Sequence, residues 1–280
     1  MAKIVKIGIV KAGGIGTMPL LEFLLDERAE REDIEVRVVG AGAKMGMEQC
    51  EDVAKAITAF TPDFALFISP NATLQGPKKG REILSSAGFP TIVISDGPTK
   101  KIVKDLEDRG FGYIIIDADA MIGARREFLD STEMALYNAD ILRVLAVTGV
   151  FNVVFQELDK VIEAVKNGKG ITLPRIVVDK EMAVHAAGFQ NPYARSKAMA
   201  AYEISRRVAD LTAEGCFVVK ERERYTPIVA AAHEMMRNAA KLADEAREME
   251  KGGDAVLRSP HHPDGSALKK RKLDEKPVKP

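Results

Sequence analysis

Short apolar runs alternate with segments of helical periodicity along the first 120 residues of the chain. Five of these runs predict buried strands, at 4–10, 34–39, 64–69, 91–95 and 113–116. Between them, apolar residues recur every three or four positions, which predicts helices at 18–28, 48–60, 78–87 and 99–109. Strands and helices that alternate in this way form βαβ units, so we expect a parallel sheet with helices on both faces.

Beyond residue 119 the pattern becomes mostly helical. The run Asp130-Ser131-Thr132-Glu133 has the spacing of a capping box, with Asp130 as the N-cap. Asn191-Pro192 and Thr226-Pro227 each place a capping side chain before a proline, which predicts the start of a helix. The second of these helices is expected to end at Gly252. Short strands are predicted at 175–178 and 216–219.

We therefore expect an α/β fold, with a Rossmann-like parallel-sheet domain at the N-terminus and a mostly helical part after it. The predicted segments are 1–122 for the sheet domain, 123–250 for the helical domain and 251–280 for a tail that lies on the surface. The basic run Lys269-Lys270-Arg271-Lys272 in this tail is short and is followed by two acidic residues. It is more typical of a solvated tail than of a nucleic-acid signal.

Composition narrows the class of protein. The chain has 41 basic and 41 acidic residues, and this neutral balance argues against a nucleic-acid partner. Apolar stretches are shorter than the roughly 20 residues of a membrane span, and the first residues lack the apolar core of a signal peptide. We expect a cytoplasmic protein without a membrane partner, whose two cysteines, Cys50 and Cys216, are reduced and bind no metal.

A glycine-rich segment, Lys11 to Thr17, follows the first predicted strand. Its glycines let backbone N–H groups approach a ligand, and the helix that follows favours an anion at its N-terminus. Pro19 stands where the dinucleotide fingerprint requires a third glycine, and the second strand ends in Val39-Gly40-Ala41-Gly42, with no acidic residue for a ribose. An anionic ligand other than a nicotinamide coenzyme is favoured, and a tight turn without a ligand remains the alternative.

Polar turn residues also follow three later strands of the predicted sheet. They are the loop from Ser69 to Pro77, the turn Asp96-Gly97-Pro98 and the turn Asp117-Ala118-Asp119. Ligands of open parallel sheets bind outside the carboxyl ends of the strands. Together these segments predict a cleft at that edge.

The second half offers cationic candidates. Arg125 and Arg126 are adjacent, and guanidinium groups bind phosphates and carboxylates in bidentate fashion. Ion pairs with neighbouring acidic residues are the alternative role for both arginines. His233 lies among small residues of a predicted helix, which suits a structural histidine slightly better than a ligand contact. The sequence contains no metal-spaced His/Cys set and no phosphate-binding lysine motif, so hydrolysis and phosphoryl transfer are poorly supported.

Several segments spread over nearly the whole chain carry a family resemblance. They are 25–29, 121–130, 133–140, 191–194, 197–201, 214–217, 227–230 and 233–235, with MIGARREFLD and EMALYNAD the longest. In these segments the sequence resembles the coenzyme F420-dependent methylenetetrahydromethanopterin dehydrogenases, archaeal enzymes of methanogenesis and one-carbon metabolism.

The resemblance implies a reversible hydride transfer from the methylene group of the pterin substrate to coenzyme F420, an 8-hydroxy-5-deazaflavin. It also implies a homo-oligomer, commonly a hexamer, without a metal and without an acid or base residue in the chemistry. The residues expected to bind the coenzyme are Gly13, Gly14, Gly16, Thr17, Pro70, Asn71, Asp96 and Gly97. The residues expected to bind the pterin are Arg125, Arg126, Asn138, Lys197 and His233, in a helical domain that completes the cleft and the oligomer interface.

Two other readings stay open at this point. One is a nicotinamide-dependent oxidoreductase, which the absorbance of the coenzyme would separate from a deazaflavin enzyme. The other is a non-catalytic member that binds pterin, because Ala12, Gly14, the loop 69–75 and the turn Asp96-Gly97-Pro98 differ from the usual pattern of the family. Tight pterin binding without turnover would support this second reading.

Overall fold

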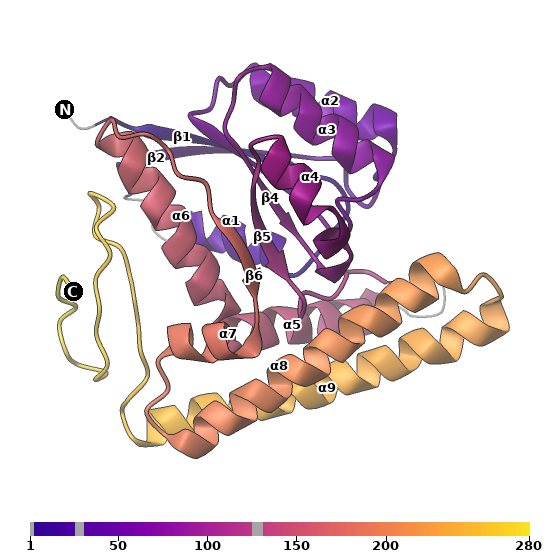
Figure 1. The fold of residues 1–280 in the computed structure, drawn as a ribbon. Helices are drawn as coiled ribbons and strands as arrows, with labels where there is room; N and C mark the ends of the chain where they lie inside the picture. The colour runs from indigo at the N-terminus through magenta and orange to yellow at the C-terminus, as the bar shows by residue number, and fades with distance from the viewer. Residues whose placement is uncertain (1–2, 26–30, 125–130) are drawn as a thin grey trace. The chain divides into compact units, whose positions relative to one another are not determined.

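The computed structural model describes residues 3–25, 31–124 and 131–280. Six strands form one sheet in the order β2-β1-β3-β4-β5-β6 (Figure 1). They are β1 (Val5–Lys11), β2 (Ile34–Gly40), β3 (Phe64–Ser69), β4 (Thr91–Ser95), β5 (Gly112–Ile116) and β6 (Arg175–Val178). The pairs β1–β2, β1–β3, β3–β4 and β4–β5 are parallel. The α/β class predicted from the sequence is confirmed.

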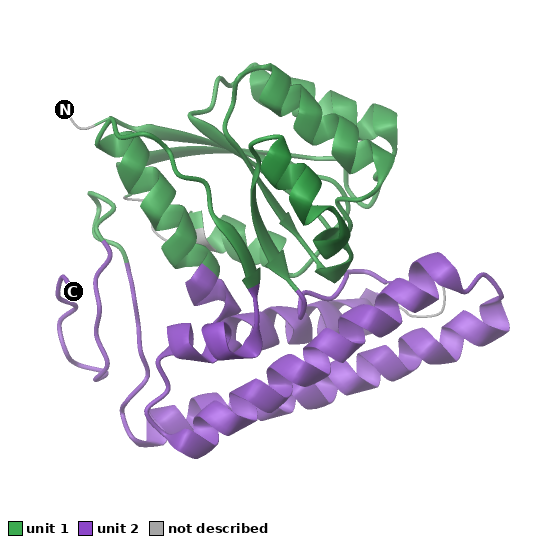
Figure 2. Ribbon diagram, in the orientation of Figure 1, with its two compact units in different colours: residues 1–116, 154–177, 261–266 green, residues 117–153, 178–260, 267–280 purple. Residues whose placement is uncertain are grey.

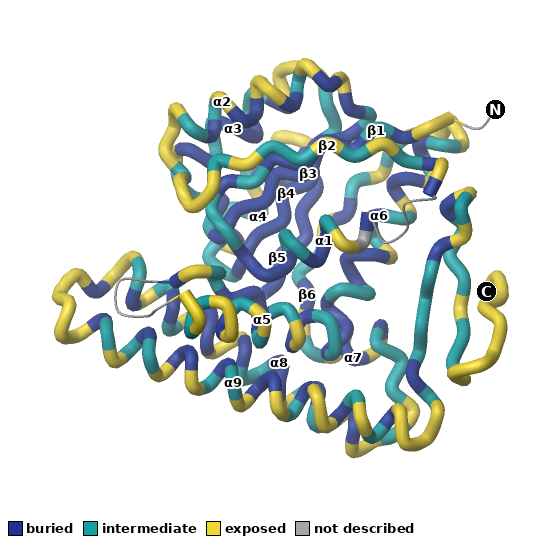
Figure 3. Tube along the Cα trace, turned by 180° about the vertical axis from the view of Figure 1, so that it is seen from behind, coloured by how far each residue is buried: buried dark blue, intermediate teal, exposed yellow. Residues whose placement is uncertain are grey.

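The central strands are buried on both faces. Every residue of β3, β4 and β5 is buried, whereas β2 at the edge alternates between half-buried and exposed positions (Figure 3). This difference explains why the central strands read as unbroken apolar runs, since helices cover both of their side-chain rows.

Helices cover the sheet from both sides. Helices α2 (Met47–Thr58), α3 (Gln75–Ser86) and α4 (Val103–Asp108) lie on one face, while α1 (Thr17–Leu25) and α6 (Val150–Lys166) lie on the other in Figures 1 and 3. In the core of the first face, Phe67 of β3 packs with Cys50 and Ile57 of α2 and Leu84 of α3. A 3₁₀ helix, η1 (Gly97–Ile102), precedes α4.

The chain forms two compact units that interleave along the sequence (Figure 2). Unit 1 comprises residues 1–116, 154–177 and 261–266, and it holds the sheet up to residue 177. Unit 2 comprises residues 117–153, 178–260 and 267–280. Among the described residues, no single helix is long and apolar enough to cross a membrane, although α5 and α6 meet that criterion together as a bent pair.

Unit 2 is mostly helical. Its helices are α5 (Ser131–Thr148), the first residues of α6, α7 (Lys180–Ala187), α8 (Pro192–Ala213), the π-helix η3 (Glu214–Val218) and α9 (Arg222–Gly252). Asn191 caps α8 as expected, with its side chain accepting from the N–H groups of Tyr193 and Ala194. Buried alanines, Ala194 and Ala198 on α8 and Ala246 on α9, let the two long helices pack closely.

The strand predicted at 216–219 is wrong, because residues Glu214–Val218 form a π-helix between α8 and α9. A Cβ on Gly215 would lie 2.4 Å from Val229 Cγ2, so the chain passes close against α9 at this point. The β-branched residues around Phe217 favour a strand locally, but the hairpin between two long helices leaves no neighbouring strand to pair with.

The helix start predicted at Thr226-Pro227 is also wrong. Helix α9 begins at Arg222, and Pro227 lies inside it. Proline removes only one backbone donor there, and the side chain of Thr226 donates to the carbonyl oxygen of Arg222 at 2.7 Å. Helices α6 and α7 were not predicted, although Asp179 caps α7 by accepting from the N–H of Met182 at 2.8 Å. The predicted capping residue Asp130 lies outside the described residues.

The C-terminal tail has no regular helix after α9. Two antiparallel bridges, Arg258 with Lys270 and Lys269 with Val278, fold part of it back on itself. The Arg271 guanidinium donates to the carbonyl oxygens of Gly188 and Ala255, at 3.1 and 2.7 Å, so one cation of the basic run fastens the tail within unit 2.

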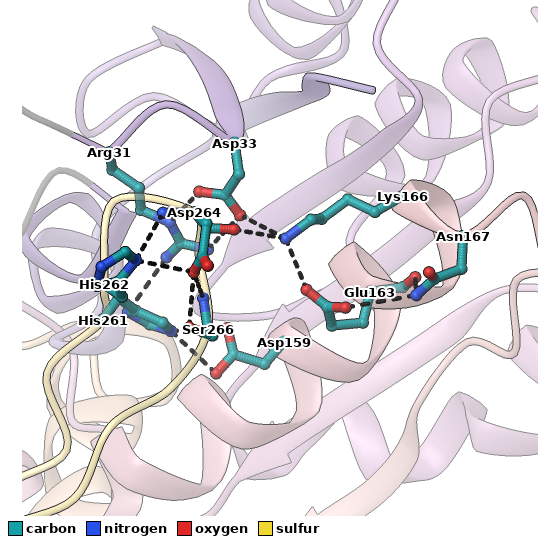
Figure 4. A network of polar contacts seen from close by, with 10 residues as sticks. All are labelled: Arg31, Asp33, Asp159, Glu163, Lys166, Asn167, His261, His262, Asp264 and Ser266. Atoms are coloured by element: carbon teal, nitrogen blue, oxygen red, sulfur yellow. Dashed lines mark hydrogen bonds and ion pairs between the residues drawn. The ribbon is translucent and has the colours of Figure 1, made fainter. Parts of the chain in front are cut away.

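A network of polar contacts fixes residues 261–266 within unit 1 (Figure 4). The buried His261 ring lies 3.2 Å from Arg31 Nη1 through Nδ1 and 3.0 Å from Asp159 Oδ1 through Nε2. Arg31 can only donate, so Nδ1 accepts and the Nε2–H donates to Asp159. His261 thereby joins its loop to the segment before β2, through Arg31, and to helix α6, through Asp159. His261 and Arg31 are 230 positions apart in the sequence.

Candidate active site

The strand order places a topological switch between β1 and β3. From β1 the chain moves outward to β2, and it then returns to β3 on the other side of β1. The connections after β1 and β3 therefore diverge at the carboxyl ends of these strands, which is the place where open α/β sheets bind their ligands. The loops at this edge are 12–16 and 70–74.

The loop after β1 is packed against its neighbours. Gly13 has φ +81°, and its N–H donates to the carbonyl oxygen of Gly42 at 3.0 Å. A Cβ on Gly13 would lie 2.8 Å from Met45 Sδ and 2.9 Å from Pro70 Cδ. The position therefore requires glycine for its backbone and for its space, and the loop turns directly into the N-terminus of α1 at Thr17, an end of a helix that favours negative charge.

A directional chain of hydrogen bonds holds the loop after β3. Ser95 Oγ donates to the carbonyl oxygen of Ser69 at 2.7 Å, so its own oxygen accepts from Thr99 Oγ1 at 2.7 Å. Thr99 Oγ1 in turn accepts from the N–H of Ala72 at 3.1 Å. All four residues are fully buried. Two hydroxyl groups on β4 and η1 thus tie both ends of this loop to the next strand.

Arg81 of α3 holds the same loop from the other side. Its side chain is 2% exposed, and Nη1 donates to the carbonyl oxygen of Ala72 at 2.7 Å. Burial lowers the pKa of Arg81, against the opposing charges of Asp105 and Glu82. A buried guanidinium is costly unless it is hydrogen-bonded, and Arg81 donates to the carbonyl oxygen of Ala72. Because the N–H of Ala72 is bonded to Thr99, both backbone groups of this residue are held.

Replacing Thr99 by valine is expected to lower the free energy of unfolding by about 1–3 kcal/mol, because the buried N–H of Ala72 loses its acceptor. Valine keeps the shape of the side chain, so packing changes little. Thr99→Ser, which keeps the hydroxyl, should recover most of the loss in urea denaturation. An unchanged Thr99→Val midpoint would show that this chain does not hold the loop.

The remaining predicted coenzyme residues lie on the same edge. Asn71 Oδ1 accepts from the N–H and the hydroxyl of Thr73, at 3.0 and 2.6 Å, which closes a tight turn. Asp96 Oδ1 accepts from the N–H of Gly97 at 2.5 Å and caps η1. The eight residues lie on the connections that follow β1, β3 and β4, with Thr17 and Gly97 as the first residues of α1 and η1. They are Gly13, Gly14, Gly16, Thr17, Pro70, Asn71, Asp96 and Gly97. Among residues of different loops in this set, the distances given above bring Gly13 and Pro70 together.

The predicted pterin residues belong to unit 2. Arg125 and Arg126 lie outside the described residues. Asn138 Oδ1 accepts from the N–H of Gly123 at 3.2 Å, and Lys197 pairs with Glu245 Oε2 at 2.5 Å.

His233 of α9 stacks on Tyr137 of α5, with ring centroids 3.7 Å apart and planes 5° from parallel. The histidine is 9% exposed, and burial, assisted by the Arg237 charge, lowers its pKa to about 4. The ring is therefore neutral near pH 7 and cannot act there as a general acid.

Sequence reasoning did not identify Arg81, Ser95, Thr99 or Tyr137. An arginine within an amphipathic helix usually lies in water, and its burial at α3 depends on the loop folded over it. Ser95 is the last residue of the predicted strand 91–95 and Thr99 closely follows it, so their position was a usable signal. Tyr137 is a buried residue of α5, and its stacking partner 96 positions later could not be inferred from spacing.

Two further observations concern the ionisable groups of the described residues. Within them, no group of three or more His, Cys, Asp or Glu side chains is placed to hold a metal ion. Burial raises the pKa of the Cys50 thiol to about 11, so this thiol is inert. The carboxyl edge of the sheet, with its glycine loop and helix N-terminus, is suited to hold an anionic ligand against a preformed surface.

Comparison with known sequences gives a match over nearly the whole chain. Residues 5–278 match the family described as methylene-5,6,7,8-tetrahydromethanopterin dehydrogenase. The F420-dependent methylenetetrahydromethanopterin dehydrogenase of Methanocaldococcus jannaschii is 56% identical over 275 residues, covering 98% of this chain and 99% of the relative. The enzyme of the same name from Archaeoglobus fulgidus is 57% identical over 274 residues, covering 98% and 99%.

A solved structure agrees with the fold. It is the structure of an F420-dependent methylene-tetrahydromethanopterin dehydrogenase in complex with methylene-tetrahydromethanopterin and coenzyme F420. The two chains are 50% identical and superimpose with a TM-score of 0.93, over 98% of this chain and 100% of the other.

Proposed function

The chain belongs to the methylenetetrahydromethanopterin dehydrogenase family, and from this membership we infer that it catalyses reversible hydride transfer between methylenetetrahydromethanopterin and coenzyme F420. The observation that carries the inference is the full-length match, at 50% identity and a TM-score of 0.93, to an enzyme solved with both ligands. The coenzyme predicted from the sequence is thereby confirmed as F420 rather than a nicotinamide.

The edge described above fits the coenzyme. Ser69 Oγ, at the carboxyl end of β3, is buried and has no hydrogen-bond partner among the described residues. The glycine loop leads into the start of α1, where the helix dipole favours an anion. We assign Gly13, Gly14, Gly16, Thr17, Pro70, Asn71, Asp96 and Gly97 to this site. When bound, coenzyme F420 supplies the deazaflavin ring that takes up the hydride.

The pterin site is assigned to Arg125, Arg126, Asn138, Lys197 and His233. Cationic side chains suit a polyanionic substrate, and the neutral His233 ring can position a ligand by hydrogen bonding without transferring a proton. In this assignment, Lys197 gives up its ion pair with Glu245 and binds the substrate instead.

The contribution of the protein is geometric. Hydride transfer needs donor and acceptor carbons held about 3–3.5 Å apart, and small displacements are costly. The hydrogen bonds of Thr99, Ser95 and Arg81 keep the loop after β3 in one conformation before the coenzyme binds, so little ordering entropy is lost on binding.

The direct transfer has an isotopic test. Methylene carrier labelled with deuterium is expected to deliver the label to reduced F420 without exchange with water. The purified chain with carrier and oxidised F420 should show loss of deazaflavin absorbance, and NAD or NADP should not replace F420. Label washed out to solvent in a single turnover would require a protein group in the transfer. Tight pterin binding without turnover would instead identify a non-catalytic member.

Loss of one arginine charge from the pterin site should weaken substrate use. Arg125→Ala and Arg126→Ala are each expected to reduce kcat/KM about tenfold or more, as a charge-assisted contact of about 1.5–3 kcal/mol is removed. Arg207→Ala, an exposed arginine on α8 outside the assigned site, is the control. Wild-type kinetics in both site variants would make the arginine pair structural.

We also propose a homo-oligomer, a hexamer by family resemblance, in the cytoplasm. Large apolar side chains of unit 2 are exposed in the single chain, including Leu136, Tyr193 and Val218. Exposed apolar groups of this kind favour association. Sedimentation at micromolar concentration should give an oligomeric mass, and a monomer would contradict the proposal.

A further inference from the structure

The connection between β2 and α2, residues 41–46, lies against the loop after β1. At its start, the N–H of Ala41 donates to the carbonyl oxygen of Lys11 at 2.9 Å. One residue further along, the carbonyl oxygen of Gly42 accepts from the N–H of Gly13 at 3.0 Å. These connections all belong to unit 1, yet none of the residues assigned to the coenzyme lies within 41–46. The backbone of this segment therefore supports a coenzyme loop from outside the assigned site.

The side chain of Met45 fills the space beside Gly13. The point where a Cβ would stand on Gly13 is 2.8 Å from Met45 Sδ, 3.1 Å from Met45 Cγ and 2.9 Å from Pro70 Cδ. Because these atoms surround one point, side chains of the connections after β2 and β3 meet at the glycine of the loop after β1. Met45 is half-buried and also packs against the core that includes Val10 and Cys50. A flexible thioether suits an irregular gap of this kind.

Helices α2 and α3 fix the backbone of Met45. Gly76, the second residue of α3, is buried, and a Cβ on it would overlap the carbonyl oxygens of Met45 and Gly46. The two backbones therefore pass so closely that only glycine fits at this position of α3. The carbonyl oxygen of Gly46 also accepts from the N–H of Cys50 at 3.0 Å, in the first turn of α2. The Met45 side chain thus extends towards Gly13 from a backbone that is held on both sides.

We propose that Met45 is a positioning residue of the coenzyme site, which holds Gly13 and Pro70 in place so that the loops after β1 and β3 present one preformed surface to the coenzyme. This role rests on the proposed function, in which Gly13 and Pro70 are assigned to the coenzyme. It requires no contact between Met45 and the ligand. The hydrogen bonds at Ala72 hold the loop after β3 two residues further along, whereas Met45 holds its first residue. A loop that is ordered before binding loses less entropy when the coenzyme binds.

Replacing Met45 by alanine removes the side chain beside Gly13 but keeps the backbone hydrogen bond between Gly13 and Gly42. The dissociation constant of coenzyme F420, measured by equilibrium dialysis with the intact chain, is expected to rise about fivefold or more, and KM for F420 should rise with it. The affinity for methylenetetrahydromethanopterin should stay within about twofold of wild type, because its assigned residues belong to unit 2. A general loss of packing would lower Tm without separating the two ligands in this way.

Two further variants control for volume and for position. Met45→Leu keeps an apolar side chain of similar size, so its affinity for F420 should stay within about twofold of wild type. Met47→Ala removes the same side chain two residues further along, where it is 55% exposed, and should leave F420 binding unchanged. Loss of F420 affinity in Met45→Ala, with recovery in Met45→Leu, would show that the bulk of this side chain sets the affinity.

A double substitution tests the contact itself. Gly13→Ala places a Cβ against Met45 and Pro70, and Met45→Ala relieves part of that clash. The loss of F420 affinity in the double variant should therefore be smaller than the product of the two single losses. A wild-type chain that does not bind F420 would overturn the proposed function and this role with it. If the wild type binds F420 but Met45→Ala binds it equally tightly, or if the two losses simply multiply, the coenzyme site stands and the role of Met45 is overturned.

Discussion

Replacing Arg31 by methionine is expected to lower the free energy of unfolding by about 3–5 kcal/mol, the cost of removing one partner from a buried ion pair. Arg31 Nε and Nη2 donate to Asp33 Oδ1 and Oδ2, at 2.6 and 3.1 Å, in a bidentate pair. The side chains of Arg31 and Asp33 are 2% and 4% exposed. Methionine fills much of the volume of arginine, so little cavity forms. The loss of stability therefore comes from the Asp33 carboxylate, which is left without its partner.

The surroundings of Asp33 determine how large the loss is. Burial raises the pKa of this carboxyl, but the hydrogen bonds and charges of Arg31 and Lys166 outweigh burial and hold the pKa below its ordinary value. Lys166 Nζ lies 3.4 Å from Asp33 Oδ2 and divides its donors between Asp33, Glu163 and the carbonyl oxygen of Asp264 (Figure 4). A Cβ on Gly265 would lie 1.8 Å from Asp33 Oδ2, so the loop closes tightly over the carboxylate. Lys166 alone is therefore a poor replacement for the bidentate arginine.

The measurement is urea denaturation at pH 7, with Arg207→Met as the matched control. Arg207 pairs with Asp210 at 3.2 Å on α8, but these side chains are 59% and 58% exposed, so the same substitution there should cost less than about 1 kcal/mol. A similar small loss in both variants would show that water or Lys166 compensates Asp33. The Arg31→Met variant should also expose the tail to protease, because His261 loses its donor.

The architecture was largely predictable because the sheet is parallel. Strands β3, β4 and β5 are buried on both faces, so their residues form unbroken apolar runs that can be recognised in the sequence. The helix start at Asn191 was readable for a similar reason, since the cap is made by neighbouring residues. The apolar runs and the helix cap each involve residues that are close in the sequence, so their spacing alone predicts them.

The errors and omissions have long-range causes. The π-helix at Glu214–Val218 and the early start of α9 at Arg222 depend on how two long helices join, and propensity favoured a strand and a later start. The three loops proposed to bind the coenzyme were indicated by glycine, proline and asparagine, but the hydrogen bonds between Ala72 and the side chains of Thr99 and Arg81 connect residues 27 and 9 positions apart. The pairing of His261 with Arg31 spans 230 positions and left no pattern in the sequence.

Acidification from pH 7 to about pH 4 is expected to remove about 3 kcal/mol of stability through His233 alone. The pKa of this histidine falls from an ordinary value of 6.5 to about 4, first because of burial and second because of the Arg237 charge. Between these two values the unfolded chain binds a proton that the folded chain does not. Stability therefore rises with pH across this window, and it is lost as the pH falls from about 6.5 towards 4.

The variant His233→Phe isolates this contribution. Phenylalanine keeps a ring to stack on Tyr137, which lies 3.7 Å away between centroids, but it carries no titrating group. Groups that titrate in both proteins, such as Asp33, cancel when the two free energies of unfolding are subtracted. The wild-type chain should lose about 3 kcal/mol more than His233→Phe between the two pH values. Only in the wild type does the unfolded chain bind a proton at this position while the folded chain keeps the imidazole neutral. Equal losses would mean that the folded chain accepts the proton, which would give His233 a charge within the proposed pterin site and reopen a role for it in proton transfer.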